Sequence, residues 1–292
     1  MPKFIVVSPQ PTYIEHIGGV TVAHTLANKL QLAGEEVYLY ADSTSPKYNI
    51  KCIPHGSVFD LDQNNTIVIL MAGTGDHTFL PNIPEFLTEA KYVVRWQVNH
   101  QRRDYPKHNK FYKFHTYWDT YETQKIDGQL SVIEIHDNIF YDKKLERTHN
   151  CYLEKGNLDE EPERMAHHPN DICIDAQLYS LPEHQKLQFL SDVFNRCKVF
   201  ISYTPLTFSS VLASMCGCVS IVIPKKNFDK EKWRSEIWCA KYGTGVGIEE
   251  MDWAMQTLPL VPSMIDEYVN ITQPTQINQF IKDCYKWTNQ TQ

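Results

Sequence analysis

Two short stretches combine small and hydroxyl-bearing residues in a way that suits the binding of a phosphate or a sugar. Gly18 and Gly19 begin an apolar-periodic segment, where a helix would leave free backbone amides that a ligand can approach closely. The segment 202–210 places hydroxyl groups around the start of a second expected helix. Because one hydroxyl is enough to cap a helix, simple capping and ligand binding both remain open for this segment. Its candidate ligand residues are Tyr203, Thr204, Thr207, Phe208, Ser209 and Ser210.

Acid–base side chains also follow expected strands, where they could remove a proton from a hydroxyl group. Asp76 and His77 come after one apolar run, His100 comes after the next, and His16 lies in the glycine loop. A turn alone would also explain Asp76, because aspartate side chains often bond their own backbone there. We predict a general base among Asp76, His77 and His16.

Lysine and glycine end another expected strand. Lys155 with Gly156 could neutralise a diphosphate leaving group, although a solvated surface lysine would look the same in sequence. Lys225 and Lys226 are weaker versions of the same pattern, after a later strand.

The sequence predicts no metal site. Asp60 and Asp62 precede a core strand, as the residues of a polar turn would, and His167 with His168 lacks further ligands at a suitable spacing. The eight cysteines are scattered, several of them within apolar runs, which favours buried reduced thiols over disulfides.

The elements that must position these residues alternate along the chain between apolar runs and amphipathic segments. Two such series predict an α/β protein with two Rossmann-like parallel-sheet domains, at 1–145 and 146–274, and a C-terminal helix within 275–292. Ligands of such sheets bind outside the carboxyl ends of the strands, so we expect a cleft where the two edges face each other. The expected strands are 3–8, 35–40, 66–72, 92–98, 131–135, 151–156, 199–203 and 219–223.

Composition narrows the class of protein. A net charge of -7 over 292 residues argues against a nucleic-acid binder that relies on bulk charge. The sequence contains no apolar run long enough for a transmembrane helix and no secretory signal, so a cytoplasmic location is expected.

Several patches of the chain resemble GT-B glycosyltransferases, the GT4-like group especially. The first patch is the glycine pair at 18–19 with its helix and the strand that follows. The segment 133–139 resembles the link between the two domains, and 203–224 resembles the donor-binding strand, helix and strand. The positions that carry the likeness are Gly18, Gly19, Val20, Ala23, Leu26, Ala27, Leu30, Gly34, Glu36, Val37, Ala213, Gly217 and 221–224.

The resemblance implies a hexosyltransferase that acts in glycan biosynthesis. It would move a hexose from a nucleotide-sugar donor to a glycan or other hydroxyl acceptor, in a cleft between two Rossmann-like domains and without a metal or other cofactor. The first domain would hold the acceptor and the second the donor. In such enzymes the last helix often crosses back onto the first domain, which makes 275–292 the candidate here. Donor contacts would come from Gly18, Gly19, Lys155, Gly156 and the hydroxyl segment after 202.

One departure from this family leaves other functions open. GT4-like enzymes usually carry a Glu-x7-Glu pair near the donor site, whereas the stretch from Val199 to Lys225 contains no carboxylate. Donor recognition would then differ from the family, or the protein would be a non-catalytic nucleotide- or sugar-binding protein. A nucleotide-sugar epimerase is a third candidate. If the reaction retained the configuration of the sugar, no base would be needed.

Overall fold

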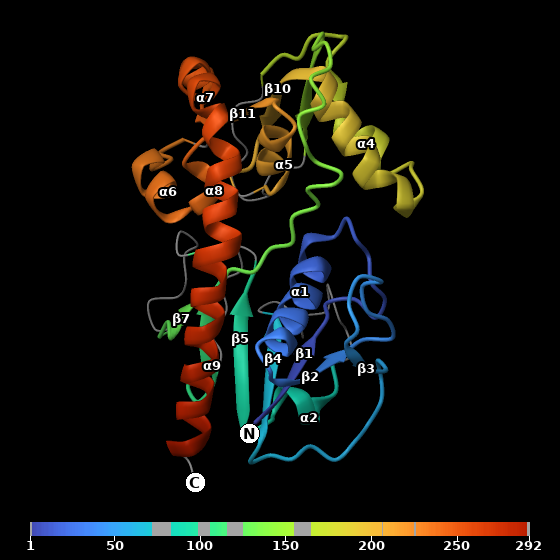
Figure 1. The fold of residues 1–292 in the computed structure, drawn as a ribbon, viewed down its shortest axis with the longest axis vertical. Helices are drawn as coiled ribbons and strands as arrows, with labels where there is room; N and C mark the ends of the chain where they lie inside the picture. The colour runs from blue at the N-terminus through green and yellow to red at the C-terminus, as the bar shows by residue number, and fades with distance from the viewer. Residues whose placement is uncertain are drawn as a thin grey trace. The chain divides into compact units, whose positions relative to one another are not determined.

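The computed structural model describes residues 2–71, 83–98, 106–115, 125–154, 165–205, 207–224 and 226–290 (Figure 1). The chain forms two compact units. Unit 1 comprises Met1–Glu134 and Val269–Gln292, and unit 2 comprises Ile135–Tyr268.

Unit 1 is built on a seven-stranded sheet in the order β3-β2-β1-β4-β5-β6-β7, in which every described pairing is parallel. Its central strands are runs of β-branched and aliphatic residues, as expected for strands that are covered on both faces. The strands are β1 (Lys3–Val7), β2 (Glu36–Tyr40), β3 (Lys51–Ile53), β4 (Thr66–Met71), β5 (Tyr92–Gln97), β6 (Lys110–Lys113) and β7 (Gly128–Gln129).

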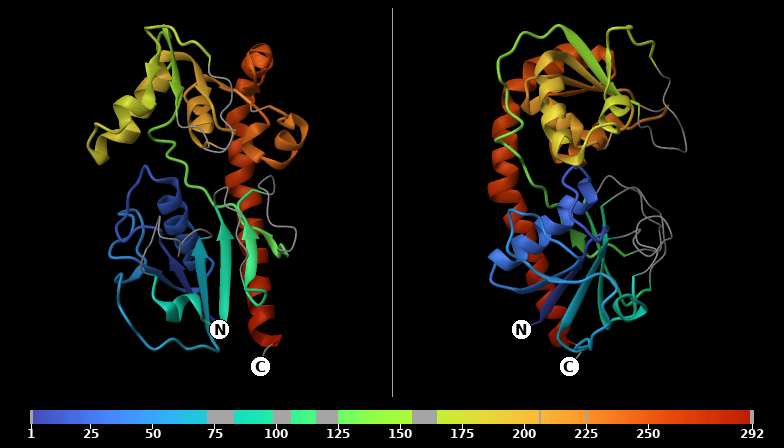
Figure 2. Two further views of the ribbon diagram at one scale, coloured as in Figure 1. Left: turned by 180° about the vertical axis from the view of Figure 1, so that it is seen from behind. Right: turned by 90° about the vertical axis from the view of Figure 1, so that its right-hand side faces the viewer.

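Helices cover both faces of this sheet (Figure 2). On one face lie α1 (Gly18–Leu32) and α9 (Gln273–Gln290), and on the other lies α2 (Glu85–Thr88). The alternation of side chains along β1 fits this arrangement, because Phe4 meets Phe280 of α9 while Ile5 belongs to the cluster that contains Leu87 of α2.

The C-terminal helix α9 is an integral part of unit 1, although about 140 residues separate it from the sheet in sequence. The buried Phe280 ring contacts the Tyr112 ring edge-on, with centroids 4.9 Å apart. At the start of the helix, the side chains of Gln276 and Gln273 accept hydrogen bonds from the backbone amides of Ser131 and Ile133, at 2.8 and 2.9 Å.

These glutamine contacts correct one expectation. Residues 131–135 do not form a strand, and β7 ends before them at Gln129. The apolar pattern reflects real burial, since Val132 is 0% and Ile133 5% exposed. However, the backbone amides of Ser131 and Ile133 bond to side chains of α9 instead of to a neighbouring strand.

Unit 2 contains a five-stranded sheet in the order β12-β11-β10-β8-β9, again parallel at every described pairing. The prediction of an α/β protein with two parallel sheets is therefore confirmed. The strands are β8 (His149–Leu153), β9 (Ile172–Cys173), β10 (Cys197–Ser202), β11 (Val219–Val222) and β12 (Thr244–Val246). The helices are α3 (Ile174–Leu178), α4 (Glu183–Arg196), α5 (Ser209–Met215), α6 (Lys230–Glu236), α7 (Met251–Thr257) and α8 (Val261–Glu267), with short 3-10 turns at Trp238–Ala240, Ile248–Glu250 and Leu258–Leu260 and a π turn at Tyr268–Thr272.

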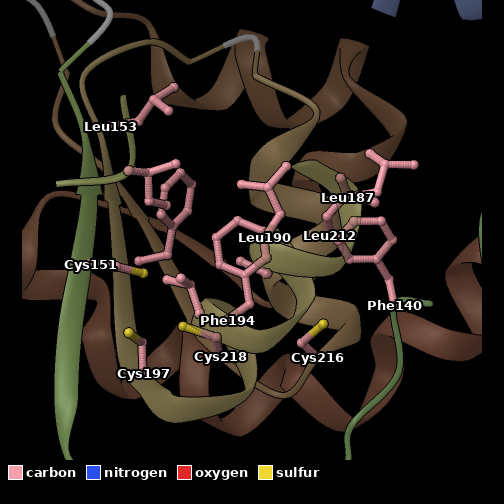
Figure 3. Close-up of a cluster of buried hydrophobic side chains, with 14 residues drawn as sticks. Phe140, Cys151, Leu153, Leu187, Leu190, Phe194, Cys197, Leu212, Cys216 and Cys218 are labelled. Carbon is pink, nitrogen blue, oxygen red and sulfur yellow. The ribbon is translucent and has the colours of Figure 1, made fainter. Parts of the chain in front are cut away.

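One core cluster of unit 2 joins β8 and β10 to α4 and α5 (Figure 3). Within it the rings of Phe194 and Phe200 make an edge contact, with centroids 5.3 Å apart. The thiols of Cys151, Cys197 and Cys218 are neighbours within the same cluster. All eight cysteines are free, as predicted, and burial raises the pKa of Cys151 well above its ordinary value. Cys151 therefore acts as a small apolar core group and is a poor nucleophile.

The change from unit 1 to unit 2 at Glu134 and Ile135 comes earlier than the expected domain boundary at 145/146. The reason is that the charged stretch 142–148 belongs to the packing of unit 2. The Arg147 guanidinium donates to the carbonyls of Phe194 and Cys197, at 2.7 and 3.0 Å. It also lies against Gly217, whose positive φ of 77° and lack of a Cβ leave room for it. The second change of unit, at Tyr268 and Val269, likewise precedes the expected 274/275.

In the part of the chain that the structure describes, no helix has both the length and the apolarity needed to cross a bilayer.

Candidate functional site

Each sheet has one point where consecutive strands are added on opposite sides, and ligands of open parallel sheets bind beside such a point, at the carboxyl ends of the strands. In the first sheet this switch lies between β1 and β4, and in the second it lies between β8 and β10.

The glycine pair lies at the first switch point. Gly18 and Gly19 begin α1, directly after the loop that leaves β1, and a Cβ on Gly19 would lie 3.5 Å from Cε of Met71 at the end of β4. Packing does not require either glycine, because a Cβ on Gly18 would meet no described atom within 4 Å and the contact at Gly19 is an ordinary one. The pair therefore leaves room above the first turn of a 15-residue helix, whose first amides lack intrahelical partners.

The loop before α1 is held by several contacts. The amide of Tyr13 donates to Oγ of Ser43 at 3.0 Å, and the hydroxyl of Thr21 donates to the carbonyl of Glu15 at 3.0 Å. Lys47 lies 3.6 Å from the Glu15 carboxylate and 2.9 Å from that of Glu134. The backbone around His16, which is half-buried, is thus fixed from both sides.

A buried histidine anchors α1 to the same edge. His24 is 0% exposed, its Nδ1 accepts from the amide of Ser45 at 3.2 Å, and its Nε2 lies 3.3 Å from Oγ of Ser8. These contacts need the neutral imidazole with its proton on Nε2, because Nδ1 is an acceptor. Burial lowers the pKa of His24 to about 4, so the ring stays neutral at physiological pH.

At the second switch point, the hydroxyl of Tyr203 organises the end of β10. It accepts from the amide of Met165 at 3.2 Å and shares a hydrogen bond of 2.7 Å with Nε2 of His167. The His167 ring stacks on Tyr152 of β8, with centroids 3.6 Å apart, and its Nδ1 faces the Asp171 carboxylate at 4.0 Å. His167, considered from sequence only as a metal ligand, is therefore a partner of the predicted site residue Tyr203.

Tyr203 itself is only 1% exposed, so a direct contact with a large ligand would need its surroundings to move. The residues that follow are more open. Thr204, Thr207 and Ser209 are partly exposed, and Phe208 is 36% exposed.

Only part of this hydroxyl segment is used for capping. Oγ1 of Thr207 accepts from the amide of Ser209 at 3.3 Å, and Oγ of Ser202 pairs with the backbone of Thr204. By contrast, Oγ of Ser210 is buried and has no hydrogen-bond partner among the described residues. A buried hydroxyl without a partner costs free energy, so Ser210 is the member of the segment that capping leaves unexplained.

Sequence reasoning missed a second polar group at this edge. After β12 the chain turns at Gly247 and brings in Glu250, which accepts from Arg234 at 2.8 Å, from Lys230 at 2.7 Å and from the amide of Val246 at 2.8 Å. Burial disfavours its charge, but these donors outweigh burial and lower the pKa of Glu250 to about 2.

The same helix α6 also reaches the hydroxyl segment, because Nε1 of Trp233 donates to the carbonyl of Pro205 at 2.9 Å. Helix α6 thus contacts the loop after β10 through Trp233 and the loop after β12 through Lys230 and Arg234. These contacts could not be predicted from sequence, since the residues that make them come from three separate segments of the chain.

Several predicted site residues lie outside the described part of the chain. Of the two lysines predicted after β11, Lys226 is described and its side chain is exposed, whereas Lys225 lies outside the described ranges. The predicted residues outside the described ranges are Asp76, His77, His100, Lys155, Gly156 and Lys225.

Among the described residues, no three histidine, cysteine, aspartate or glutamate side chains are grouped so that they could hold a metal ion. Asp62 accepts from the amide of Asn64 at 3.2 Å and from the side chain of Asn65 at 3.0 Å, which is the geometry of a turn.

Comparisons with known proteins give distant structural likeness and no match in sequence. No protein-family model matches the chain, and no curated protein sequence matches it. Among solved structures, the glycosyltransferase SnogD from Streptomyces nogalater is similar over 97% of this chain and 99% of that one, with 9% identity and a TM-score of 0.39. A likeness this weak carries no conclusion about function.

The buried His24 predicts a pH-dependent stability. Because its pKa falls from 6.5 to about 4 on folding, the unfolded chain binds the proton more readily between these values. The stability that neutral His24 provides is therefore complete above pH 6.5 and is lost as the pH falls toward 4, by roughly 3 kcal/mol in all.

In the variant His24→Asn, the side-chain oxygen can still accept from Ser45 but cannot be protonated. We expect this variant to have a lower free energy of unfolding than wild type at neutral pH. Its free energy of unfolding should fall less than that of wild type between about pH 7.5 and about pH 5, measured by urea unfolding. His115, whose pKa is also lowered to about 4 by burial, keeps part of the pH dependence in both proteins. The exposed His184→Asn is the control, and an unchanged loss in His24→Asn would contradict the assignment.

Proposed function

We propose that the protein is a glycosyltransferase that moves a hexose from a nucleotide-sugar donor to a hydroxyl group of a glycan or other acceptor, without a metal ion. One observation carries the proposal: a single chain holds two parallel-sheet units, each with ligand-type residues at the carboxyl edge beside its switch point. Two such edges suit a reaction with two substrates. The sequence resemblance to GT4-like enzymes supports the same assignment, although fold alone does not define chemistry.

In this proposal unit 2 binds the donor. The partly exposed hydroxyls of Thr204, Thr207 and Ser209 would meet the nucleotide sugar, with Tyr203 positioning His167 behind them. The buried, unpartnered Oγ of Ser210 would reach the donor after a local movement of the residues that cover it. Lys155 and Gly156 would meet the donor's diphosphate. The ion pairs of Glu250 keep the neighbouring edge rigid, which lowers the entropic cost of binding.

Unit 1 binds the acceptor. Its glycine pair at α1 offers amides to an oxygen of the acceptor or of the donor phosphates, and the fixed loop before α1 holds His16 nearby. The general base would be Asp76, His77 or His16, and a reaction that retained the sugar configuration would need none.

A second candidate is a nucleotide- or sugar-binding protein without catalysis. It is favoured by the absence of any carboxylate from Val199 to Lys225 and by the pairing of Glu250 with two cations. A nucleotide-sugar epimerase is the third candidate, and it differs in that it would need no acceptor.

Incubation of the full chain with a panel of nucleotide sugars and saccharide acceptors separates the three candidates. A transferase releases nucleoside diphosphate only when an acceptor is present, and the release continues in EDTA because no metal is required. Interconversion of the donor alone would identify an epimerase. Thermal stabilisation by a nucleoside diphosphate or a saccharide without turnover would identify a binding protein, and no effect of any nucleotide, donor or saccharide would contradict all three.

The variant Ser210→Ala tests the donor site directly. Because Oγ of Ser210 has no described partner, its removal should leave the free protein as stable as wild type, or slightly more stable. If that hydroxyl binds the donor, nucleotide-sugar affinity should fall about fivefold to tenfold in calorimetric titration.

Ser220→Ala is the matched control, because Ser220 of β11 is also buried with an unpartnered Oγ but lies within the strand. It should change neither affinity nor stability by much. Equal donor affinity in both variants and wild type would remove Ser210 from the site.

A further inference from the structure

A pocket of about 200 Å³ lies within unit 1, away from the edge described above. It forms where α9 passes β6 and β7. Lys110 is the first residue of β6, and Asp127 immediately precedes β7, so the pocket lies toward the amino ends of these strands. The switch point of the same sheet is at the carboxyl ends. The lining residues are Lys110, Tyr112, Asp127, Asp283, Lys286 and Trp287.

The first wall of the pocket is a fixed tyrosine–aspartate pair. The Tyr112 hydroxyl donates to Oδ2 of Asp283 at 3.1 Å, and Oδ1 of Asp283 accepts from Gln279 at 2.8 Å. The Tyr112 ring packs so close to Gly128 that a Cβ there would lie 2.7 Å from Cε1. Burial and the nearby Cys284 and Asp283 raise the pKa of Tyr112 above its ordinary value, so its hydroxyl remains a donor.

The second wall is Asp127, whose carboxylate is also fixed. Oδ1 accepts from Nζ of Lys110 at 2.9 Å, and Oδ2 accepts from the amide of Phe111 at 2.9 Å. Each carboxylate oxygen has a second lone pair, so Asp127 and Asp283 can each accept a further hydrogen bond.

Donors and an apolar surface complete the lining. The Lys286 side chain is exposed and makes no ion pair with any described residue, so its ammonium has donors to offer. Trp287 is half-buried, held by an edge contact with Tyr92 at 5.1 Å, and has the Lys110 ammonium 5.8 Å from its ring centroid. An indole of this kind presents an apolar face beside polar groups.

The charges and the size together define the ligand. The two lysines and two aspartates of the lining cancel, and Lys125, which lies 3.9 Å from Oδ1 of Asp127, is 85% exposed and therefore well screened by water. An ion of either sign thus gains little, whereas a neutral molecule with many hydroxyls can donate to the aspartates and accept from the lysines. A volume of about 200 Å³ is below the ~300–1,000 Å³ of pockets for drug-sized ligands, so the pocket suits a single sugar ring better than a whole nucleotide sugar. The C–H face of a sugar ring matches the indole.

We propose that this pocket binds a single sugar ring, either as a free monosaccharide or as one residue of a glycan chain. This binding function goes beyond the proposed transfer reaction and does not depend on it, because the pocket lies toward the amino ends of the strands, whereas the switch point is at their carboxyl ends. In a glycan-modifying enzyme, such a site would hold a distant part of the acceptor and raise its local concentration.

The test is saturation-transfer NMR on the full chain with methyl glycosides of glucose, galactose, mannose and N-acetylglucosamine, and with the corresponding disaccharides. The experiments with methyl glycosides and with disaccharides both measure binding and need no enzymatic turnover. We expect at least one sugar to receive saturation from the protein, and a nucleoside diphosphate not to displace it. Stronger binding of the disaccharide than of its methyl glycoside would identify a glycan chain as the source, and equal binding would identify a free monosaccharide.

Two variants locate the binding. Lys286→Ala and Asp283→Asn should each weaken sugar binding about fivefold to tenfold and leave nucleotide affinity unchanged. Lys282→Ala, an exposed lysine on the same helix that does not line the pocket, should have no effect. Lys286 is exposed, so its variant should fold even if Asp283→Asn does not. No sugar binding, binding unaffected by Lys286→Ala, or binding only of inorganic phosphate or glycine, tested in parallel, would overturn the proposal.

Discussion

The parallel hydrogen-bond register of two sheets is the constraint on which the rest of the structure depends. When neighbouring strands run in the same direction, each must return through a crossover, and the loops that follow the strands gather at one edge. In unit 2 this brings Tyr203 after β10 beside His167, which is 36 residues earlier, and brings Glu250 after β12 to Arg234 and Lys230. The chemistry-bearing groups thus converge because of the backbone topology.

Unit 1 satisfies the same constraint with a segment from the other end of the chain. Its sheet is covered by α1 and α9 on one face, and α9 replaces a strand partner for residues 131–133 through Gln273 and Gln276. Without α9, the rings of Phe4 and Tyr112 in the sheet would lose their contact with Phe280. The second crossing of the chain between units falls at the π turn of Tyr268–Thr272, a rare helix geometry that often marks functional positions.

Much of the fold could be predicted from sequence, because the buried strands are long apolar runs and the helices are strongly periodic. The glycine pair was correctly expected at a helix start. Short elements escaped: β6 carries two lysines in four residues, and β12 includes a glycine, so neither has the pattern of a buried strand. The strand expected at 131–135 was wrong, because an apolar run reports burial and not the partner of its amides.

The candidate site was less predictable for a physical reason. The hydroxyl segment after β10 could be predicted as a candidate from sequence because its residues are contiguous. The contact of Tyr203 with His167 and the ion pairs of Glu250 join residues 16 to 36 positions apart, and no local pattern encodes them. The neutral pocket beside Trp287 was missed for the same reason, since β6, β7 and α9 each contribute only part of it.

Photo-crosslinking with azido-substituted nucleoside diphosphates, followed by peptide mapping, tests the central claim most directly. We expect label in the loops at the carboxyl edge of the second sheet, in peptides that contain 203–210 or 247–250, and competition by the unmodified nucleotide. Label confined to other parts of the chain, such as the amino ends of the strands, or label that the unmodified nucleotide does not displace, would contradict it.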